Sequence, residues 1–362
     1  MDARRQTLAA QDLDALFLRL EQDGHQVVAP VVRDGAPLLE GVRSASALAT
    51  GWQDDQTPGR YRLVPDPDGR FFGALHGPQS AKTWLHPPHA TLFHATQSAS
   101  GFRIADPEPT PRLALVGLRA SDLAAVVVQD GVLGRAPWPD PHYTARRADV
   151  FLVAVQCHRA ISTCFCRSMG TGPRVRSGYD LCLTEVVDNG GHRFVVEVGS
   201  EAGALVARDL PLVEAEGDAD APERAAADTE AAITRHLPTE GLRERLLDAL
   251  DEPRWSEVAE RCLGCANCTM VCPTCYCTAV DDVTDLEGGT SRERRWDSCF
   301  HTDFTHVHGG AVRTSLAARY RQWLTHKLAT WHDQFGRGGC VGCGRCITWC
   351  PSGIDLVEEA LR

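Results

Sequence analysis

The stretches CLGCANCTMVCP, from Cys262 to Pro273, and CVGCGRCITWCP, from Cys340 to Pro351, are two copies of one cysteine pattern. Both read C-x2-C-x2-C-x3-C-P, the run of bacterial two-cluster ferredoxins, in which the fourth cysteine of each run ligates the other run's cluster. We therefore expect two [4Fe-4S] clusters with crossed ligands. Cluster site 1 consists of Cys262, Cys265, Cys268 and Cys350. Cluster site 2 consists of Cys340, Cys343, Cys346 and Cys272.

Each run has a glycine between its first two cysteines, Gly264 and Gly342. Glycine permits the tight turns and the close backbone approach that a metal–sulfur core requires. The alternative is structural zinc, which usually takes paired cysteines or histidines separated by a long spacer. The duplicated triplet, with a fourth cysteine before proline, favours clusters.

Composition and charge restrict the function further. The chain has 362 residues and 15 cysteines, eight of them in the two runs, and cluster ligands must be reduced thiolates, so a cytoplasmic location is expected. The N-terminus has no signal-peptide pattern, and no segment reaches the ~20 apolar residues of a membrane span. A net charge of −11 argues against nucleic acid as a partner.

The expected fold class is α+β. Residues 1–213 are predicted to form a mixed α/β domain, 214–250 a linker with helices, and 251–362 a helical ferredoxin-type domain with two [4Fe-4S] clusters. Strands are predicted at 26–32, 113–116 and 150–155, and hairpins at 61–75, around PDPDG, and at 181–198, around Asn189-Gly190. Ser121 is predicted to cap the helix DLAAVVVQ.

The segment between the two runs, residues 273–339, is much longer than the corresponding segment of small ferredoxins. It contains an amphipathic helical pattern whose apolar face carries Leu316, Tyr320, Trp323, Leu324, Leu328, Trp331 and Phe335. These aromatic residues are interpreted as core.

Seven cysteines lie outside the two runs. Cys157, Cys164 and Cys166, the third cysteine group, follow a predicted strand, and Cys182 is interpreted as a buried strand thiol. Thr163-Cys164-Phe165-Cys166 is echoed by Thr274-Cys275-Tyr276-Cys277, and Cys299 lies in WDSCF. Two interpretations stay open for the third cysteine group: a third metal site, such as a third iron–sulfur cluster, or thiols packed beside the clusters. Cys275, Cys277 and Cys299 have no assigned role.

The chain shows no motif for a two-electron cofactor. Gly170 and Gly172 form a G-x-G without the rest of a dinucleotide fingerprint, and we interpret them as a loop. No catalytic residue is assigned. Because clusters carry single electrons, hydride chemistry is expected on another polypeptide.

Several segments together carry a resemblance to a known family. They are GLRASDLAAVVVQD (117–130), TCFCRSMGTGP (163–173), GYDLCLTE (178–185), CLGCANCTMVCPTCYC (262–277), WDSCF (296–300) and CVGCGRCITWCP (340–351). Over residues 110–362 the chain resembles the β subunit of cytosolic NAD(P)-linked [NiFe] hydrogenases of the sulfhydrogenase type, a family that includes the corresponding electron-transfer subunit of anaerobic sulfite reductase. It departs from the family pattern at Ala120-Ser121-Asp122, where relatives have Pro-Cys-Asp.

The resemblance implies an electron-transfer subunit that connects the small and large hydrogenase subunits with an NAD(P)H-binding flavoprotein subunit. The first alternative replaces the hydrogenase by a sulfite reductase subunit. The second is a redox enzyme that uses its own N-terminal domain. The sequence leaves open the terminal partner, the direction of electron flow and the choice between NADH and NADPH.

Overall fold

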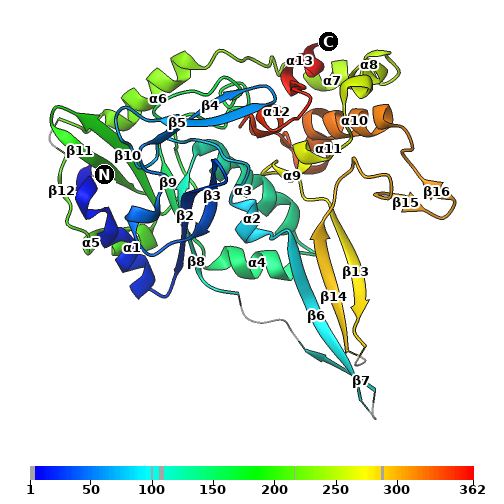
Figure 1. The fold of residues 1–362 in the computed structure, drawn as a ribbon, viewed down its shortest axis with the longest axis horizontal. Helices are drawn as coiled ribbons and strands as arrows, with labels where there is room; N and C mark the ends of the chain where they lie inside the picture. Colours follow the sequence, from blue (N-terminus) through cyan, green and yellow to red (C-terminus); the bar gives the residue numbers. More distant parts are fainter. Residues whose placement is uncertain (1–4, 99–100, 106–109, 216, 287–288) are drawn as a thin grey trace.

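The computed structural model of the protein describes residues 5–98, 101–105, 110–215, 217–286 and 289–362. The start of the N-terminal segment and residue 216 of the predicted linker lie outside this description. The N-terminal region is built on an eight-stranded sheet (Figure 1). In spatial order its strands are β12 (Val213–Glu214), β1 (Gln6–Ala9), β11 (Gly191–Val198), β10 (Leu181–Asp188), β9 (Phe151–Val155), β8 (Leu113–Leu118), β2 (Gln26–Arg33) and β3 (Ala36–Gly41).

The centre of this sheet, β10-β9-β8-β2, is parallel, and its outer pairs are antiparallel. Its strands are apolar on both faces, as expected of parallel strands covered on two sides. In β2, Val27, Ala29 and Val31 point into one core, while Val28 points into the other. The predicted strands at 26–32, 113–116 and 150–155, and the hairpin with its turn at Asn189-Gly190, are confirmed.

Helices cover both faces of the sheet. One face packs against α1 (Leu13–Gln22) and α5 (Glu201–Arg208). The other packs against α2 (Lys82–Leu85), α3 (Ala120–Leu133) and α4 (Pro141–Ala148). α3 begins directly after the carboxyl end of the parallel strand β8. Its first turn therefore lies at the carboxyl end of the parallel strands, which faces the cysteine-rich region.

The C-terminal region is mainly helical. After α6 (Ala221–Ala232), its helices are α7 (Leu242–Asp248), α8 (Arg254–Arg261), α9 (Asn267–Met270), α10 (Leu316–Thr325), a π-helical turn (His326–Thr330), α11 (Trp331–Phe335), α12 (Arg345–Thr348) and α13 (Leu356–Leu361). The predicted amphipathic helix is therefore present as α10–α11. Tyr320, Trp323, Leu324, Leu328 and Trp331 are buried, which confirms the core interpretation for these residues. The α+β fold class is confirmed.

A second sheet joins segments that are far apart in the chain. β6 (His89–Ser98) and β7 (Gly101–Ala105) pair with β13 (Thr278–Thr284) and β14 (Gly289–Trp296), in the order β13-β14-β6-β7. Figure 1 shows this sheet as an arm that extends away from both cores. The sequence did not indicate the strands between the two cysteine runs, because their burial is low and their charged residues do not give an apolar alternation. Two short hairpins complete the strands: β4 (Trp52–Thr57) with β5 (Arg60–Pro65), and β15 (His306–Val307) with β16 (Gly310–Ala311).

The predicted hairpin at 61–75 is wrong. β5 pairs with β4 across Pro58-Gly59, and residues 71–75 form no strand. Their backbone donors go to buried carboxylates instead: Phe71 and Phe72 donate to Glu185 at 2.6 and 3.1 Å, and Leu75 donates to Asp54 at 2.7 Å. Side-chain carboxylates from outside the segment thus accept the hydrogen bonds that a paired strand was expected to accept.

The predicted cap of α3 is also wrong. Arg119 is the N-cap residue, and its backbone N–H donates to the Asp122 carboxylate at 3.1 Å. Ser121 lies inside the first turn, where its hydroxyl is 3.3 Å from His76 Nε2.

Among the described residues, no helix is both long and apolar enough to cross a membrane.

Candidate iron–sulfur centre

The backbone of the first cysteine run brings its thiols to one side. α8 ends at Arg261, and the chain then turns through Gly264 and Ala266, both with a φ of +64°. Cys268 follows in the short helix α9. The Gly264 N–H points at the Cys262 sulfur at 3.4 Å, the type of hydrogen bond that stabilises a bound thiolate.

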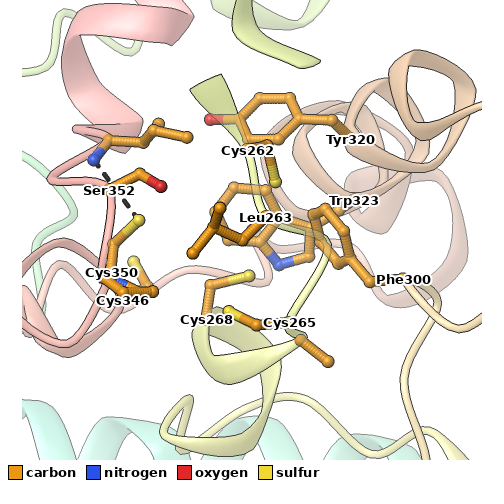
Figure 2. A pocket seen from close by; sticks show the side chains of 13 residues that line it. Cys262, Leu263, Cys265, Cys268, Phe300, Tyr320, Trp323, Cys346, Cys350 and Ser352 are labelled. Atoms are coloured by element: carbon orange, nitrogen blue, oxygen red, sulfur yellow. Dashed lines mark hydrogen bonds between the residues drawn. The ribbon is translucent and has the colours of Figure 1, made fainter. Parts of the chain in front are cut away.

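All four thiols of cluster site 1 line one cavity. Figure 2 shows Cys262, Cys265 and Cys268 from the first run facing this cavity together with Cys350 from the second. The Cys350 sulfur accepts the Ile354 N–H at 3.4 Å. The wall of the cavity is largely apolar and includes Phe300, Tyr320 and Trp323.

Cluster site 2 repeats the same backbone pattern. Gly342 and Gly344 have φ values of +64° and +80°, and the Gly342 N–H points at the Cys340 sulfur at 3.4 Å. Burial is the main cause that raises the pKa of the Cys340 thiol to about 12, and the nearby thiols of Cys343 and Cys272 contribute to the rise. Cys272, from the first run, therefore lies among the thiols of the second.

The two sites are neighbours. Cys346, a member of cluster site 2, also lines the cavity of cluster site 1 (Figure 2). Burial raises the pKa of Cys346 well above the ordinary thiol value, and the thiols that raise it further include Cys268 of the other site. The two groups of thiols therefore lie side by side.

The donor chemistry fits iron–sulfur clusters. Eight thiols lie in two groups of four, each group receives backbone N–H bonds to sulfur, and burial makes free thiolates at Cys268 and Cys346 costly. A metal takes the thiols as thiolates and thereby removes that cost. Among the described residues, no three Cys, His, Asp or Glu side chains converge as they do around a single metal ion.

The third cysteine group is brought together by the fold. Cys157, Cys164 and Cys166 are 7–9% exposed. A hydrogen bond from Cys166 lowers the pKa of Cys164, and burial raises the pKa of Cys157 to about 11, with Cys164 adding to the rise. Three thiols from the loop after β9 thus share one buried region.

A second set of thiols also meets beside cluster site 2. The Cys275 thiol hydrogen-bonds Cys272, and a hydrogen bond from Cys299 lowers the pKa of Cys277 to about 7. WDSCF and TCYC therefore meet in space. Cys182 is fully buried in β10, as predicted.

The loop that carries the third cysteine group packs directly on the second cysteine run. Phe165 N–H donates to the Gly342 carbonyl at 2.8 Å, and a Cβ at Gly342 would lie 2.7 Å from the Cys166 nitrogen. A Cβ at Gly264, at the equivalent place in the first run, would meet only the Leu316 side chain at 3.4 Å. A Cβ at Gly172 would make a tight contact, 3.1 Å from the Cys166 sulfur. The loop that carries the G-x-G motif thus packs closely on this thiol at Gly172.

A buried ion pair joins the two regions beside cluster site 2. Arg345 of α12 lies 2.8 Å from Asp122 of α3, and both side chains are at most 5% exposed. Arg345 also donates to the Gly77 carbonyl at 3.0 Å and hydrogen-bonds Cys343. Sequence reasoning missed this pair, because nothing in either segment indicates that α3 and α12 meet.

Fold and site together define an iron–sulfur protein with a ferredoxin-type cluster domain. In agreement, the family model described as a 4Fe-4S dicluster domain matches residues 261–354. The sulfhydrogenase 2 subunit beta of Pyrococcus furiosus is 34% identical over 256 residues, which make up 68% of this chain and 72% of that protein. The chain belongs to the family of sulfhydrogenase β subunits. No solved structure gives a significant match.

Proposed function

We propose that this chain is the electron-transfer subunit of an NAD(P)-linked [NiFe] hydrogenase. It relays single electrons between a flavoprotein subunit that handles NAD(P)H and the hydrogenase small and large subunits. The observation that carries the proposal is the adjacency of the two four-thiol groups, in which Cys346 of cluster site 2 lines the cavity of cluster site 1. Membership of the sulfhydrogenase β family supports a hydrogenase, rather than a sulfite reductase, as the terminal partner.

In this proposal each cluster site holds one [4Fe-4S] cluster, which supplies a one-electron couple when bound. The eight thiols hold the clusters, and the N–H groups of Gly264, Gly342 and Ile354 stabilise the thiolates. Phe300, Tyr320 and Trp323 exclude water from one side of cluster site 1. A cytoplasmic location is part of the proposal, because clusters and free thiols persist in a reducing compartment.

The cluster-loaded chain alone is expected to show no steady reduction of methyl viologen with NADPH or hydrogen. It should become reduced when NADPH is added together with a flavoprotein subunit, because hydride chemistry needs the flavin. The measurement is anaerobic absorbance of the clusters with each component present or omitted. The Cys182→Ser variant, which loses a thiol outside both runs, is the control and should behave like the unaltered chain. Steady turnover of NADPH by the single chain would instead support an enzyme with its own N-terminal site. Co-purification with a siroheme subunit would select the sulfite reductase alternative.

We further propose that Cys157, Cys164 and Cys166, with one further cysteine, hold a third iron–sulfur cluster rather than a single metal ion; their shared burial and the contact of their loop with the second run support this. If the site holds a cubane, iron should be about twelve per chain and fall to about eight in the triple Ser variant. Iron and acid-labile sulfide analysis measures this, again with Cys182→Ser as the control. Equal iron in the triple variant and the unaltered chain would leave the group as packed thiols.

A further inference from the structure

The two lysines of this chain occupy unusual positions. Lys82 and Lys327 are its only lysines among 37 lysine and arginine residues, so arginine supplies every other permanent cation. Lysine is almost never fully buried unless it is paired. Here Lys82 is 5% and Lys327 is 3% exposed, and both lie next to the cysteine-rich segment Cys272–Cys277.

Lys327 contacts a proposed cluster ligand. Its Nζ lies 3.2 Å from the Cys272 sulfur, and it also donates to Thr274 Oγ1 at 3.0 Å and to the Gly339 carbonyl at 3.3 Å. Thr274 Oγ1 is itself 3.2 Å from the same sulfur. Lys327 lies in the π-helical turn between α10 and α11.

Among the described residues, no carboxylate forms an ion pair with Lys327. Two of the three hydrogen bonds of its Nζ go to neutral oxygens, and the Trp331 ring centroid lies 5.8 Å away. A buried ammonium is stable only with a compensating negative charge. The Cys272 sulfur, 3.2 Å from Nζ, supplies that negative charge when it is a thiolate.

Cluster site 1 has a different electrostatic environment. Its cavity is lined by cysteines, apolar and aromatic side chains and Ser352, with no Lys, Arg or His among the described lining residues. Three features of cluster site 1 favour added negative charge there and so oppose the effect of Lys327. Cys265 is exposed to solvent, and the positive charge of Arg319 acts on Cys262. Two backbone N–H groups bond to sulfurs of cluster site 1, against one at cluster site 2.

We propose that Lys327 raises the reduction potential of the cluster at site 2 above that of the cluster at site 1, so that site 2 is the electron acceptor of the pair. Reduction adds one negative charge to a cluster, and a buried cation in contact with a ligand sulfur stabilises that charge more than distant solvent does. The step is one electron leaving the site 1 cluster and entering the site 2 cluster, while Lys327 keeps its protons. The inference rests on the proposed ligand sets.

The test is an EPR-monitored redox titration of the cluster-loaded full chain. Cys265→Ser and Cys343→Ser assign the signals of sites 1 and 2. Lys327→Met removes the charge and keeps a flexible side chain. It should lower the site 2 potential enough to change the reduced-to-oxidised ratio at a fixed potential by at least tenfold, which corresponds to 59 mV for one electron. Lys327→Arg keeps the charge and should restore most of that ratio.

Lys82→Met is the matched control. Lys82 has the same charge and similar burial, but its Nζ donates to the Cys275 and Met270 carbonyls at 3.2 and 3.4 Å and lies over the Trp296 ring. Among the described residues, none of its hydrogen bonds goes to a run sulfur. It should shift the site 2 potential less than Lys327→Met does. Equal shifts from the two variants, equal shifts at both clusters, or no shift with Lys327→Met would overturn the inference. Absence of two cluster signals in the unaltered chain would instead overturn the ligand sets.

Discussion

Cys350→Ser is expected to destroy the cluster of site 1, although residue 350 belongs to the second run. The reason is that the Cys350 sulfur faces the same cavity as Cys262, Cys265 and Cys268. Iron should fall from about eight to about four per chain at the two run sites, since one cubane is lost. Iron analysis and EPR measure the loss, and Cys350→Ala covers the case in which a serine oxygen still ligates iron.

The reciprocal variant sharpens this result. Cys272→Ser should remove the site 2 signal and leave that of site 1, because the Cys272 thiol lies among those of Cys340 and Cys346. Cys182→Ser, at a fully buried thiol in β10, should leave both signals intact. Selective loss of the cluster in the altered residue's own run would exclude crossed ligation.

Breaking the buried Asp122–Arg345 pair is expected to lower the free energy of unfolding more than breaking an ion pair at the surface. Removing one member of a buried pair leaves the other charge uncompensated, which typically costs about 3–5 kcal/mol. Asp122→Asn and Arg345→Met should each lower the free energy of unfolding by about this amount, and the double variant by less than the sum. Denaturant unfolding of the cluster-loaded chain provides the measurement.

The control for this cycle is an ion pair of similar geometry at the surface. Arg243 and Asp333 lie 2.8 Å apart, but their side chains are 38% and 49% exposed. Water screens such pairs, so Asp333→Asn should cost at most about 1 kcal/mol. If Asp122→Asn cost no more than Asp333→Asn, the buried pair would not be what joins α3 to α12.

The predictions that succeeded depend on short-range patterns. Strands β2, β8 and β9 are buried on both faces, so each appears in the sequence as a continuous apolar run. Such a run can be recognised without knowing which elements pack against it. The Asn189-Gly190 turn has the local chemistry of a two-residue hairpin. The hairpin at 61–75 failed because Glu185, more than a hundred residues away, takes the backbone donors of Phe71 and Phe72.

The sequence by itself determined the type of cofactor and its ligand candidates, because cluster ligation depends on cysteine spacing within one turn of backbone. Only the tertiary structure placed Lys327 on the Cys272 sulfur, closed Gly342 against Cys166 and paired Arg345 with Asp122. These contacts join segments far apart in the chain, and no local pattern encodes them. Electrostatic energy depends on distance and burial in the folded molecule, so the unequal environments of the two cluster sites arise from the tertiary structure alone.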